Sequence, residues 1–258
     1  MSYRETRVIS DPFLSALDRE STASLAASMN EAARRRQPRR SDPEYAVLKH
    51  LQKAIVNSLT SIPEPIKVAV DFGCGSRPYD QEVRRVASHL IGVDLVGNSL
   101  ADITHIAGER VPLPDSVADL VVSFQVLEHI PTPQDYLQEV RRLLRPGGYL
   151  LLSTHGVWPY HPHPGDYHRW TSQGLRSEIE QARFAVRELT PVLTGWATTL
   201  QLRLSILRYT CWTRRRHRWP TRLVSWTASW LLDLLVGRPS SADNLLACVY
   251  IVLAVRSG

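Results

Sequence analysis

The chain of 258 residues is long enough for one sizeable α/β domain with a large core, but short for two full independent domains. Its hydrophobic content of 43% and charged content of 22% are those of an ordinary globular protein. A formal net charge of +6 favours an anionic partner, such as nucleic acid, an anionic membrane or a phosphorylated substrate. A solvated basic surface accounts for this charge equally well.

Cysteine usage and hydropathy bear on the location of the protein. The three cysteines are far apart and odd in number, so they fit neither a disulfide framework nor a zinc pattern. The segment up to Leu14 lacks the basic region and apolar run of a secretory signal. The late apolar stretches Leu223–Val236 and Leu245–Val255 fall short of the roughly 20 residues that a spanning helix needs. We expect a cytoplasmic protein, either soluble or peripheral at the inner face of the membrane.

Residues 1–41 are polar, rich in Ala, Ser and Arg, and end in a cluster of arginines. We interpret them as a basic, partly flexible N-terminal arm. The helix predicted next, from Asp42 to Leu59, has Pro43 in its first turn and apolar residues at helical spacing.

From Ile66 onward, short β-branched runs alternate with helical stretches, a pattern typical of a parallel sheet with crossover helices. The predicted strands are Lys67–Asp71, Leu90–Asp94, Asp119–Phe124, Tyr149–Ser153, Phe184–Leu189 and Leu245–Val255. The predicted helices among them are Asp80–Ala87, Pro133–Leu144, Ser172–Ala182 and the longer stretch Trp196–Val236.

This alternation predicts an α/β fold with a doubly wound, mostly parallel, Rossmann-like sheet and helices on both faces. We expect residues 42–195 to form its core. Residues 196–243 are then a Trp- and Arg-rich helical insertion before the last strand, and residues 244–258 are the C-terminal strand that completes the core.

The first predicted strand runs directly into a glycine-containing turn, Asp71-Phe72-Gly73-Cys74-Gly75. Glycines there let the backbone approach a ligand, and parallel sheets bind nucleotides at the carboxyl ends of their strands. The next strand ends in Asp94, whose carboxylate can accept the hydroxyl hydrogens of a ribose. Dinucleotide-binding folds share this geometry, but they need a third glycine where this chain has Pro78. The Asp71 carboxylate would also repel a pyrophosphate, whereas it suits the cationic amine of a methionine moiety.

Further motifs follow in a fixed order. They are Asp102-Ile103, the segment Pro112–Asp119, the Ser123–Ile130 segment with Glu128-His129, and Leu144–Gly148. With the glycine turn and Asp94, they make the chain from about Lys67 to Ser153 resemble the core of class I S-adenosylmethionine-dependent methyltransferases. The resemblance is to the type 11-like group related to ubiquinone-type and sugar methyltransferases. The segment Ser76–Tyr79 resembles a subgroup associated with glycan and lipid biosynthesis.

The resemblance implies a seven-stranded sheet and S-adenosyl-L-methionine as the cofactor. It assigns cofactor binding to Asp71, Gly73, Cys74, Gly75, Asp94, Leu95, Asp102, Ile103, Ser123 and Gln125. Among these, Asp94 matches the ribose-binding acid of the family and Asp102 the acid that faces the adenine amine. The methyl group of this cofactor is already strongly electrophilic, so the protein mainly has to hold an acceptor in line with it. A hydroxyl acceptor also benefits from a general base.

Histidines concentrate after the fourth and fifth strands, where the site is expected. The segment Thr154–Thr171 is rich in groups that transfer protons or bind sugars, and it resembles a loop of glycan-associated members of the family. The candidates for the general base are His129, His161 and His168, with Asp166 as a partner. Alternatively, Asp166 pairs with Arg169 to hold the loop, and Thr171 or Ser172 caps the next helix. We expect no metal, because alternating prolines constrain the loop against convergent ligation.

Three interpretations of the insertion stay open. Its segment 212–236 carries an arginine cluster followed by Trp226 and Trp230, which suits peripheral contact with a membrane. It suits equally a lid over the substrate or the surface of a homodimer.

These features together predict S-adenosylmethionine-dependent methyl transfer to a hydroxyl of a sugar, glycolipid or other secondary metabolite, by in-line displacement with a histidine general base. The expected partner is a small-molecule or glycolipid acceptor. A nucleic acid methyltransferase is disfavoured, because the chain lacks an Asn-Pro-Pro-Tyr-like segment and an RNA-binding module. A non-catalytic scaffold that binds the cofactor is a third hypothesis, against which the intact loop and several candidate bases argue.

Overall fold

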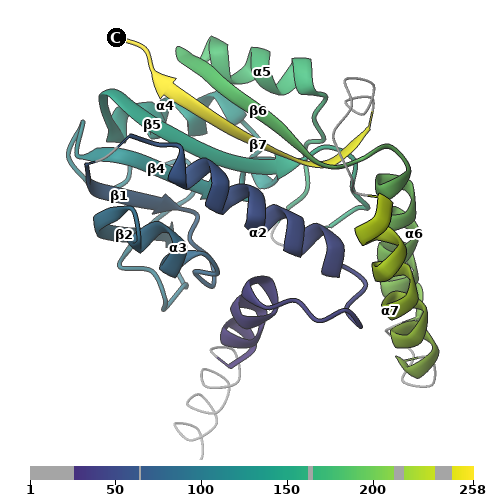
Figure 1. Cartoon of the computed structure of the whole chain (residues 1–258). Helices are drawn as coiled ribbons and strands as arrows, with labels where there is room; N and C mark the ends of the chain where they lie inside the picture. The colour runs from purple at the N-terminus through teal and green to yellow at the C-terminus, as the bar shows by residue number, and fades with distance from the viewer. Residues whose placement is uncertain (1–25, 64, 162–164, 212–217, 236–245) are drawn as a thin grey trace, which may run out of the picture.

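Seven strands form one twisted sheet through the middle of the molecule (Figure 1). The computed structural model describes residues 26–63, 65–161, 165–211, 218–235 and 246–258. The strands are β1 (Ile66–Phe72), β2 (Ala87–Leu95), β3 (Ile103–His105), β4 (Ala118–Phe124), β5 (Leu144–His155), β6 (Phe184–Thr194) and β7 (Ala247–Arg256). Their order in the sheet is β3-β2-β1-β4-β5-β7-β6.

The strands are parallel except β7, which pairs antiparallel with both β5 and β6. The chain runs outward from β1 toward β3 on one side and from β4 toward β5 on the other. The direction of winding therefore reverses between β1 and β4. In open α/β sheets, ligands bind at such a reversal, outside the carboxyl ends of the strands.

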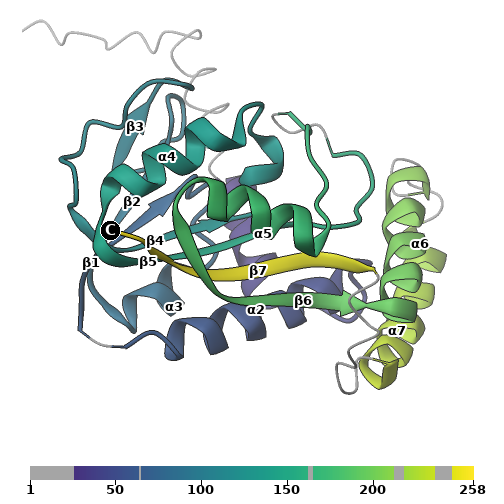
Figure 2. The ribbon, with the colours of Figure 1, turned by 90° about the horizontal axis from the view of Figure 1, so that it is seen from above.

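Helices cover both faces of the sheet (Figure 2). On one face lie α2 (Tyr45–Thr60) and α3 (Asp80–Arg84), and on the other α4 (Pro133–Leu143) and α5 (Ser172–Gln181). Each face has its own hydrophobic core, built in part by Leu51 and Ile55 of α2 and by Leu137 and Val140 of α4. Because the central strands lie between two cores, they are nearly continuous apolar runs instead of alternating ones.

Between β6 and β7 the chain forms a pair of helices, α6 (Gly195–Cys211) and α7 (Arg218–Leu235), at one end of the sheet (Figure 1). The side of α7 that faces the rest of the molecule is polar where it meets α2 and the residues before it. Asp233 lies 2.8 Å from a guanidinium nitrogen of Arg40 and 2.9 Å from the ammonium nitrogen of Lys49. The hydroxyl of Ser229 donates to the backbone oxygen of Arg40 over 3.0 Å. Within the described ranges, no helix is long and apolar enough to cross a membrane.

The predicted fold class is confirmed, including the helices on both faces and the helical insertion before the last strand. Three details differ. The helix predicted from Asp42 begins at Tyr45, because the Asp42 carboxylate accepts the Glu44 amide in a turn that precedes the helix. Strand β3 was not predicted, and the stretch Trp196–Val236 is two helices instead of one.

Truncation of a buried β5 side chain should test the core between the sheet and α2. Leu151 is fully buried in that core. We expect Leu151→Ala to lower the free energy of unfolding by about 2–5 kcal/mol, since it leaves a cavity that the sheet cannot close. Urea unfolding followed by circular dichroism measures this. The matched change Leu223→Ala, at a position on α7 that is 52% exposed, should alter it by about 0.5 kcal/mol or less. Equal losses in the two variants would contradict the assignment of Leu151 to the core.

Candidate active site

A cavity of about 1370 Å³ opens at the carboxyl ends of β1, β2, β4 and β5. This volume exceeds the roughly 300–1,000 Å³ of a typical single-ligand pocket. The cavity therefore has room for two molecules, such as a cofactor and an acceptor. One part of its wall is formed by the glycine turn after β1 and the end of β2, and another by the ends of β4 and β5.

The turn after β1 requires glycine at its first position. Gly73 has a φ of +80°, and a Cβ atom there would lie 2.6 Å from a methyl carbon of Val126. A side chain is thus excluded both by backbone conformation and by space. The Gly73 amide donates to the backbone oxygen of Val93 over 2.8 Å, which ties the turn to β2. Gly73, Cys74 and Gly75 all line the cavity, as the sequence predicts.

Asp94 at the end of β2 also lines the cavity. Its carboxylate accepts the Gly75 amide over 2.8 Å, the Asn98 side-chain amide over 2.6 Å and the Leu95 amide over 2.7 Å. The three donors hold the two loops together. A carboxylate has about four acceptor positions, so capacity remains for a ribose hydroxyl. Leu95 lies beside it on the cavity wall.

Asp71 is the buried carboxylate of the site. Asp71 is only 4% exposed and lines the cavity. Burial raises the pKa of Asp71 to about 7, and the charge of Arg77 opposes this only in part. A buried carboxylate that faces a cavity favours a cationic ligand. The cationic amine of S-adenosyl-L-methionine fits this position.

Gln125 at the end of β4 lines the cavity in a strained conformation. Its φ is +59°, which is uncommon for a residue other than glycine. Two hydrogen bonds to Ser153 of β5 stabilise this conformation. The backbone amide of Gln125 donates to the backbone oxygen of Ser153 over 2.9 Å, and the side-chain amide of Gln125 donates to the Ser153 hydroxyl over 3.1 Å. Strained residues of this kind concentrate at functional sites.

The structure does not bring Asp102, Ile103 and Ser123 to the cavity wall. The Asp102 carboxylate accepts the Gly92 amide over 2.7 Å and pairs with Arg77 at 2.9 Å, so it fastens the loop before β3. Ser123 is buried and lies 2.8 Å from the Tyr136 hydroxyl. In the structure Asp102 and Ser123 make contacts that support the site, and the cofactor contacts of Asp102, Ile103 and Ser123 stay a prediction.

A carboxylate and a histidine come together at the ends of β4 and β5. Nδ1 of His155 lies 2.9 Å from Oε1 of the fully buried Glu128, whose other oxygen accepts the Thr154 hydroxyl over 2.8 Å. The His155 ring lines the cavity and stacks on Trp158, with ring centroids 5.1 Å apart. Burial on its own would raise the pKa of Glu128, but His155 beside it holds that pKa below its ordinary value. The sequence analysis missed this pair, which places a buried carboxylate beside a cavity-lining imidazole. Among the described residues, Oε1 of Glu128 and Nδ1 of His155 have no hydrogen-bond partner, so the contact is a close approach of the two groups.

His129 and His161 also line the cavity, as the sequence analysis expects of a base. Their rings meet edge to face, with centroids 5.4 Å apart. Nδ1 of His129 contacts the backbone oxygen of Gly165. Burial, helped by the nearby His155 and His129, lowers the pKa of His161 to about 4. His161 is therefore neutral near pH 7 and a weak proton acceptor.

His168 and Asp166 lie outside the cavity lining. The Asp166 carboxylate accepts a guanidinium nitrogen of Arg169 over 2.6 Å and the His161 amide over 2.7 Å. Arg169 also donates to the backbone oxygens of Trp158 and Pro159, so the pair fastens the loop after β5. This is the structural alternative considered above. The predicted cap is confirmed as well, because the Thr171 hydroxyl accepts the Gly174 amide over 3.0 Å.

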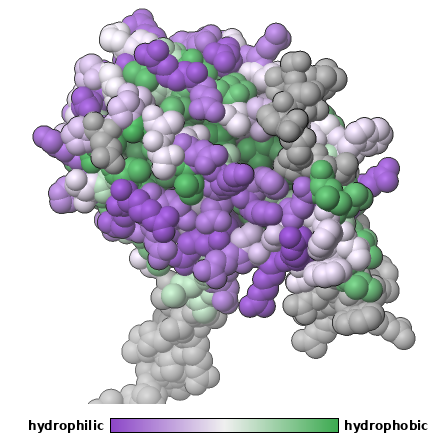
Figure 3. Space-filling model, viewed as in Figure 1, coloured by the Kyte–Doolittle hydropathy of each residue, from purple (hydrophilic) through white to green (hydrophobic). Residues whose placement is uncertain are grey.

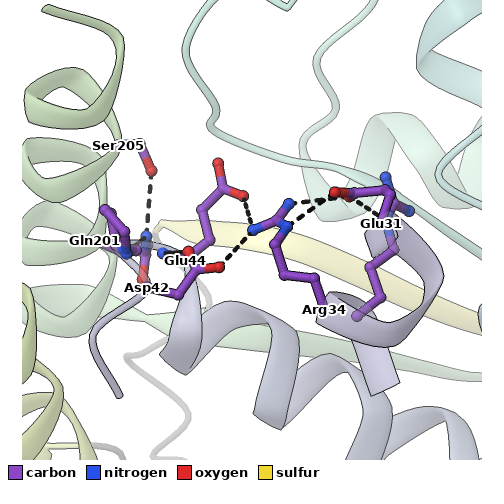
Figure 4. Close-up of polar contacts among 8 residues, drawn as sticks. Glu31, Arg34, Asp42, Glu44, Gln201 and Ser205 are labelled. Carbon is purple, nitrogen blue, oxygen red and sulfur yellow. Dashed lines mark hydrogen bonds and ion pairs between the residues drawn. The ribbon is translucent and has the colours of Figure 1, made fainter. Parts of the chain in front are cut away.

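The N-terminal arm contributes to the cavity wall. Residues 26–36 are helical, and Arg34 from this helix pairs with Glu31, Asp42 and Glu44 at 2.9 Å each (Figure 4). Burial would raise the pKa of Glu31, yet hydrogen bonds from Arg34 lower it to about 2. Glu31, Arg34 and Glu44 all line the cavity. The described part of the arm is thus held against the site by an ionic cluster.

A metal centre finds no support in the described part of the chain, where no group of three or more His, Cys, Asp or Glu side chains could hold a metal ion. His163 of the histidine-rich loop lies outside the described residues.

Comparison with known proteins agrees with the cofactor half of this site. Residues 70–152 match the family model described as "Methyltransferase domain". Over this segment the chain is therefore similar to methyltransferase domains. A "Probable S-adenosylmethionine-dependent methyltransferase" of Mycolicibacterium smegmatis is 30% identical over 141 residues, or 49% of this chain and 55% of that protein. The ubiquinone biosynthesis O-methyltransferase of Cupriavidus pinatubonensis is 33% identical over 103 residues, or 34% of this chain and 41% of that protein. The cofactor of the domain is S-adenosyl-L-methionine.

Solved structures show the same fold at low identity. An S-adenosylmethionine-dependent methyltransferase of Thermotoga maritima has a TM-score of 0.52 and 10% identity, covering 83% of this chain and 93% of its own. Phosphoethanolamine N-methyltransferase 2 of Haemonchus contortus, solved with S-adenosyl-L-methionine, has a TM-score of 0.50 and 16% identity, covering 81% of this chain and 52% of its own. The chain spans about half the length of the curated relatives it matches.

The raised pKa of Asp71 predicts a pH-dependent cofactor affinity. Below pH 7 the Asp71 carboxyl carries a proton in the free protein and has to lose it before it can pair with the cofactor amine. Affinity should therefore fall as the pH falls, with a dissociation constant about fivefold higher at pH 6 than at pH 7. Isothermal titration with S-adenosyl-L-methionine measures this.

Two variants separate this effect from a general loss of binding. Asp71→Asn should bind more weakly and lose the pH dependence between pH 6 and pH 7. Asp94→Asn should bind more weakly at both pH values but keep the dependence, because Asp71 is intact. If wild-type affinity is the same at the two pH values, Asp71 does not need to ionise to bind the cofactor.

Proposed function

We propose that this protein transfers the methyl group of S-adenosyl-L-methionine to a hydroxyl of a sugar, glycolipid or other secondary metabolite. The observation that carries the proposal is the Glu128–His155 pair on the wall of a cavity that also contains the cofactor loop. A hydroxyl is a poor nucleophile until its proton is removed, so a positioned imidazole favours a hydroxyl acceptor.

His155 is the general base in this proposal, and Glu128 is its positioning residue. Nδ1 lies 2.9 Å from the Glu128 carboxylate, so in this proposal the other ring nitrogen, Nε2, accepts the hydroxyl proton. The ionised Glu128 stabilises the imidazolium that forms, as the acid does in other carboxylate–histidine pairs. Nδ1 of His129 faces the backbone oxygen of Gly165, whereas Nδ1 of His155 faces a carboxylate.

Bound S-adenosyl-L-methionine supplies an electrophilic methyl group on a sulfonium. Asp71 would hold its amine, Asp94 its ribose, and the turn from Gly73 to Gly75 would approach it through the backbone. With the cofactor bound, the acceptor oxygen would receive the methyl group and the cofactor would leave as a neutral thioether. His155 would remove the hydroxyl proton and keep it as an imidazolium, so the overall charge is conserved. No metal or redox partner enters this balance.

The walls of the acceptor side suit an amphiphilic molecule that carries a sugar. Trp158 and Tyr167 provide aromatic surface, and His161, Glu44 and Glu31 provide hydrogen-bonding groups. Another part of the wall is apolar, formed by Val47, Leu48 and Leu51 of α2. Such pockets recognise ligands through mostly apolar contact and a few placed polar groups.

The proposed activity can be tested with octyl glycosides as model acceptors and methyl-labelled cofactor. We expect S-adenosyl-L-homocysteine and a methylated glycoside to form in equal amounts. Absence of cofactor binding in isothermal titration would exclude the activity altogether. Cofactor binding without turnover on any glycoside would favour the non-catalytic scaffold, and turnover on nucleic acid alone would favour the alternative acceptor class.

The base assignment predicts a separation of turnover from binding. His155→Ala should lower kcat by about 100-fold to 10,000-fold and leave the dissociation constant of the cofactor unchanged, since only proton removal is lost. Glu128→Gln, which keeps the size of the side chain, should lower kcat and shift the rising limb of its pH profile. His168→Ala, at a residue that does not line the cavity, should leave kcat within about twofold. The assignment fails if His168→Ala impairs turnover more than His155→Ala.

A further inference from the structure

Helix α7 turns an apolar face away from the rest of the molecule. Its large apolar residues of 47–69% exposure recur at helical spacing, and we call them the α7 stripe: Leu223, Val224, Trp226, Trp230, Leu231 and Leu234. Hydrophobic atoms come to the surface on the α6–α7 side of the molecule (Figure 3). Protein surfaces seldom leave a continuous apolar patch of this kind uncovered unless it binds something.

The opposite side of α7 explains why the stripe faces outward. Leu232 is fully buried there, and Asp233 and Ser229 bind the side chain and the backbone oxygen of Arg40. A rotation of α7 that buried the stripe would break these bonds and leave the Asp233 carboxylate without its two cations. The orientation of the helix is therefore set by specific polar contacts.

Charge next to the stripe is positive. Asp233 is the one acidic residue in the sequence of α7, and it faces inward against Arg40 and Lys49, so two cations meet one carboxylate. The Arg40 guanidinium lies 6.0 Å from the ring centroid of Trp230, at the edge of the stripe.

We propose that the α7 stripe docks on the surface of an anionic lipid bilayer. Tryptophan side chains favour the headgroup level of a membrane, and arginines next to them pair with lipid phosphates. In a twofold dimer of this chain, both partners would contribute the same patch to the interface. The positively charged edge at Arg40 and Lys49 would then meet a patch that is itself positively charged. Charge complementarity thus favours anionic lipid over a second copy.

Residues 40–44 connect the proposed docking surface to the cavity. At one end Arg40 contacts Trp230 and Asp233 of α7, and at the other Glu44 lines the cavity and pairs with Arg34 (Figure 4). The side chain of Gln201 on α6 donates to the backbone oxygen of Pro43 over 2.8 Å. If the acceptor is a glycolipid, which rests on the proposed function, docking through α7 would bring the chain to the surface that carries its acceptor.

Co-sedimentation with vesicles tests the docking proposal. We expect the full chain to bind vesicles of phosphatidylcholine mixed with phosphatidylglycerol, more weakly at high salt, and to bind phosphatidylcholine alone poorly. Trp226→Ser and Trp230→Ser should each lower the partition coefficient by about tenfold, since each removes a half-exposed indole from the contact. The matched change Ile106→Ser, at a 57% exposed position beside the edge strand β3, should leave it unchanged.

Each other outcome overturns the proposal. It fails if the wild type does not bind anionic vesicles, or if the two tryptophan variants bind them as well as the wild type. It also fails if sedimentation velocity shows a dimer that Trp230→Ser dissociates, because the stripe is then an interface between two copies. Cofactor titration on the same variants keeps this test separate from the proposed activity: the tryptophan variants should bind S-adenosyl-L-methionine as the wild type does.

Discussion

The buried carboxylate of Glu128 is the interaction on which the architecture of the site depends. It is fully buried at the end of β4, where an unpaired charge would be strongly destabilising. Thr154 and His155 at the end of β5 therefore have to face it, and its backbone oxygen accepts the amides of Tyr167 and His168 at 2.9 and 3.2 Å. One residue thus connects β4, β5 and the loop that closes the acceptor side. The close approach of the His155 imidazole to the Glu128 carboxylate is also the contact that compensates the buried charge.

Much of the fold could be predicted from local patterns. The strands β1, β4 and β5 lie between two helix layers, so their sequences are continuous apolar runs that stand out from the helices. Strand β3 has three residues, none of them buried, and such a short half-exposed strand has no hydrophobic signature. Its place in the sheet comes from pairing with β2, which no local pattern encodes. The start of α2 was misplaced for a similar reason, because a proline-containing turn and a helix begin with the same residues.

The cofactor side of the site could be predicted from the sequence, whereas the acceptor side could not. Asp71 and Asp94 each lie at the carboxyl end of a strand, so local order alone places both at one edge of the sheet, where they line the cavity. The Glu128–His155 pair joins the short helical turn Leu127–His129, which follows β4, to the last residue of β5, so it depends on how β4 and β5 pair. The signal that could have found it is a glutamate and a histidine that both follow apolar strands. Asp102 instead precedes strand β3, and in the structure Arg77 and the Gly92 amide engage its carboxylate.

Helix α7 shows why periodicity alone cannot say which face of a helix is inside. Its apolar residues recur at helical spacing, which normally marks the buried face. Here the surface against which α7 packs presents the backbone oxygen of Arg40 and the charged side chains of Arg40 and Lys49. All three groups need polar partners. Ser229 and Asp233 meet that need, so the polar side of the helix packs inward and the tryptophans face out. Arg40 and Lys49 form the basic edge of this surface, and their contacts with α7 also turn the apolar face of the helix outward. A single set of contacts therefore produces a surface that is both basic and aromatic.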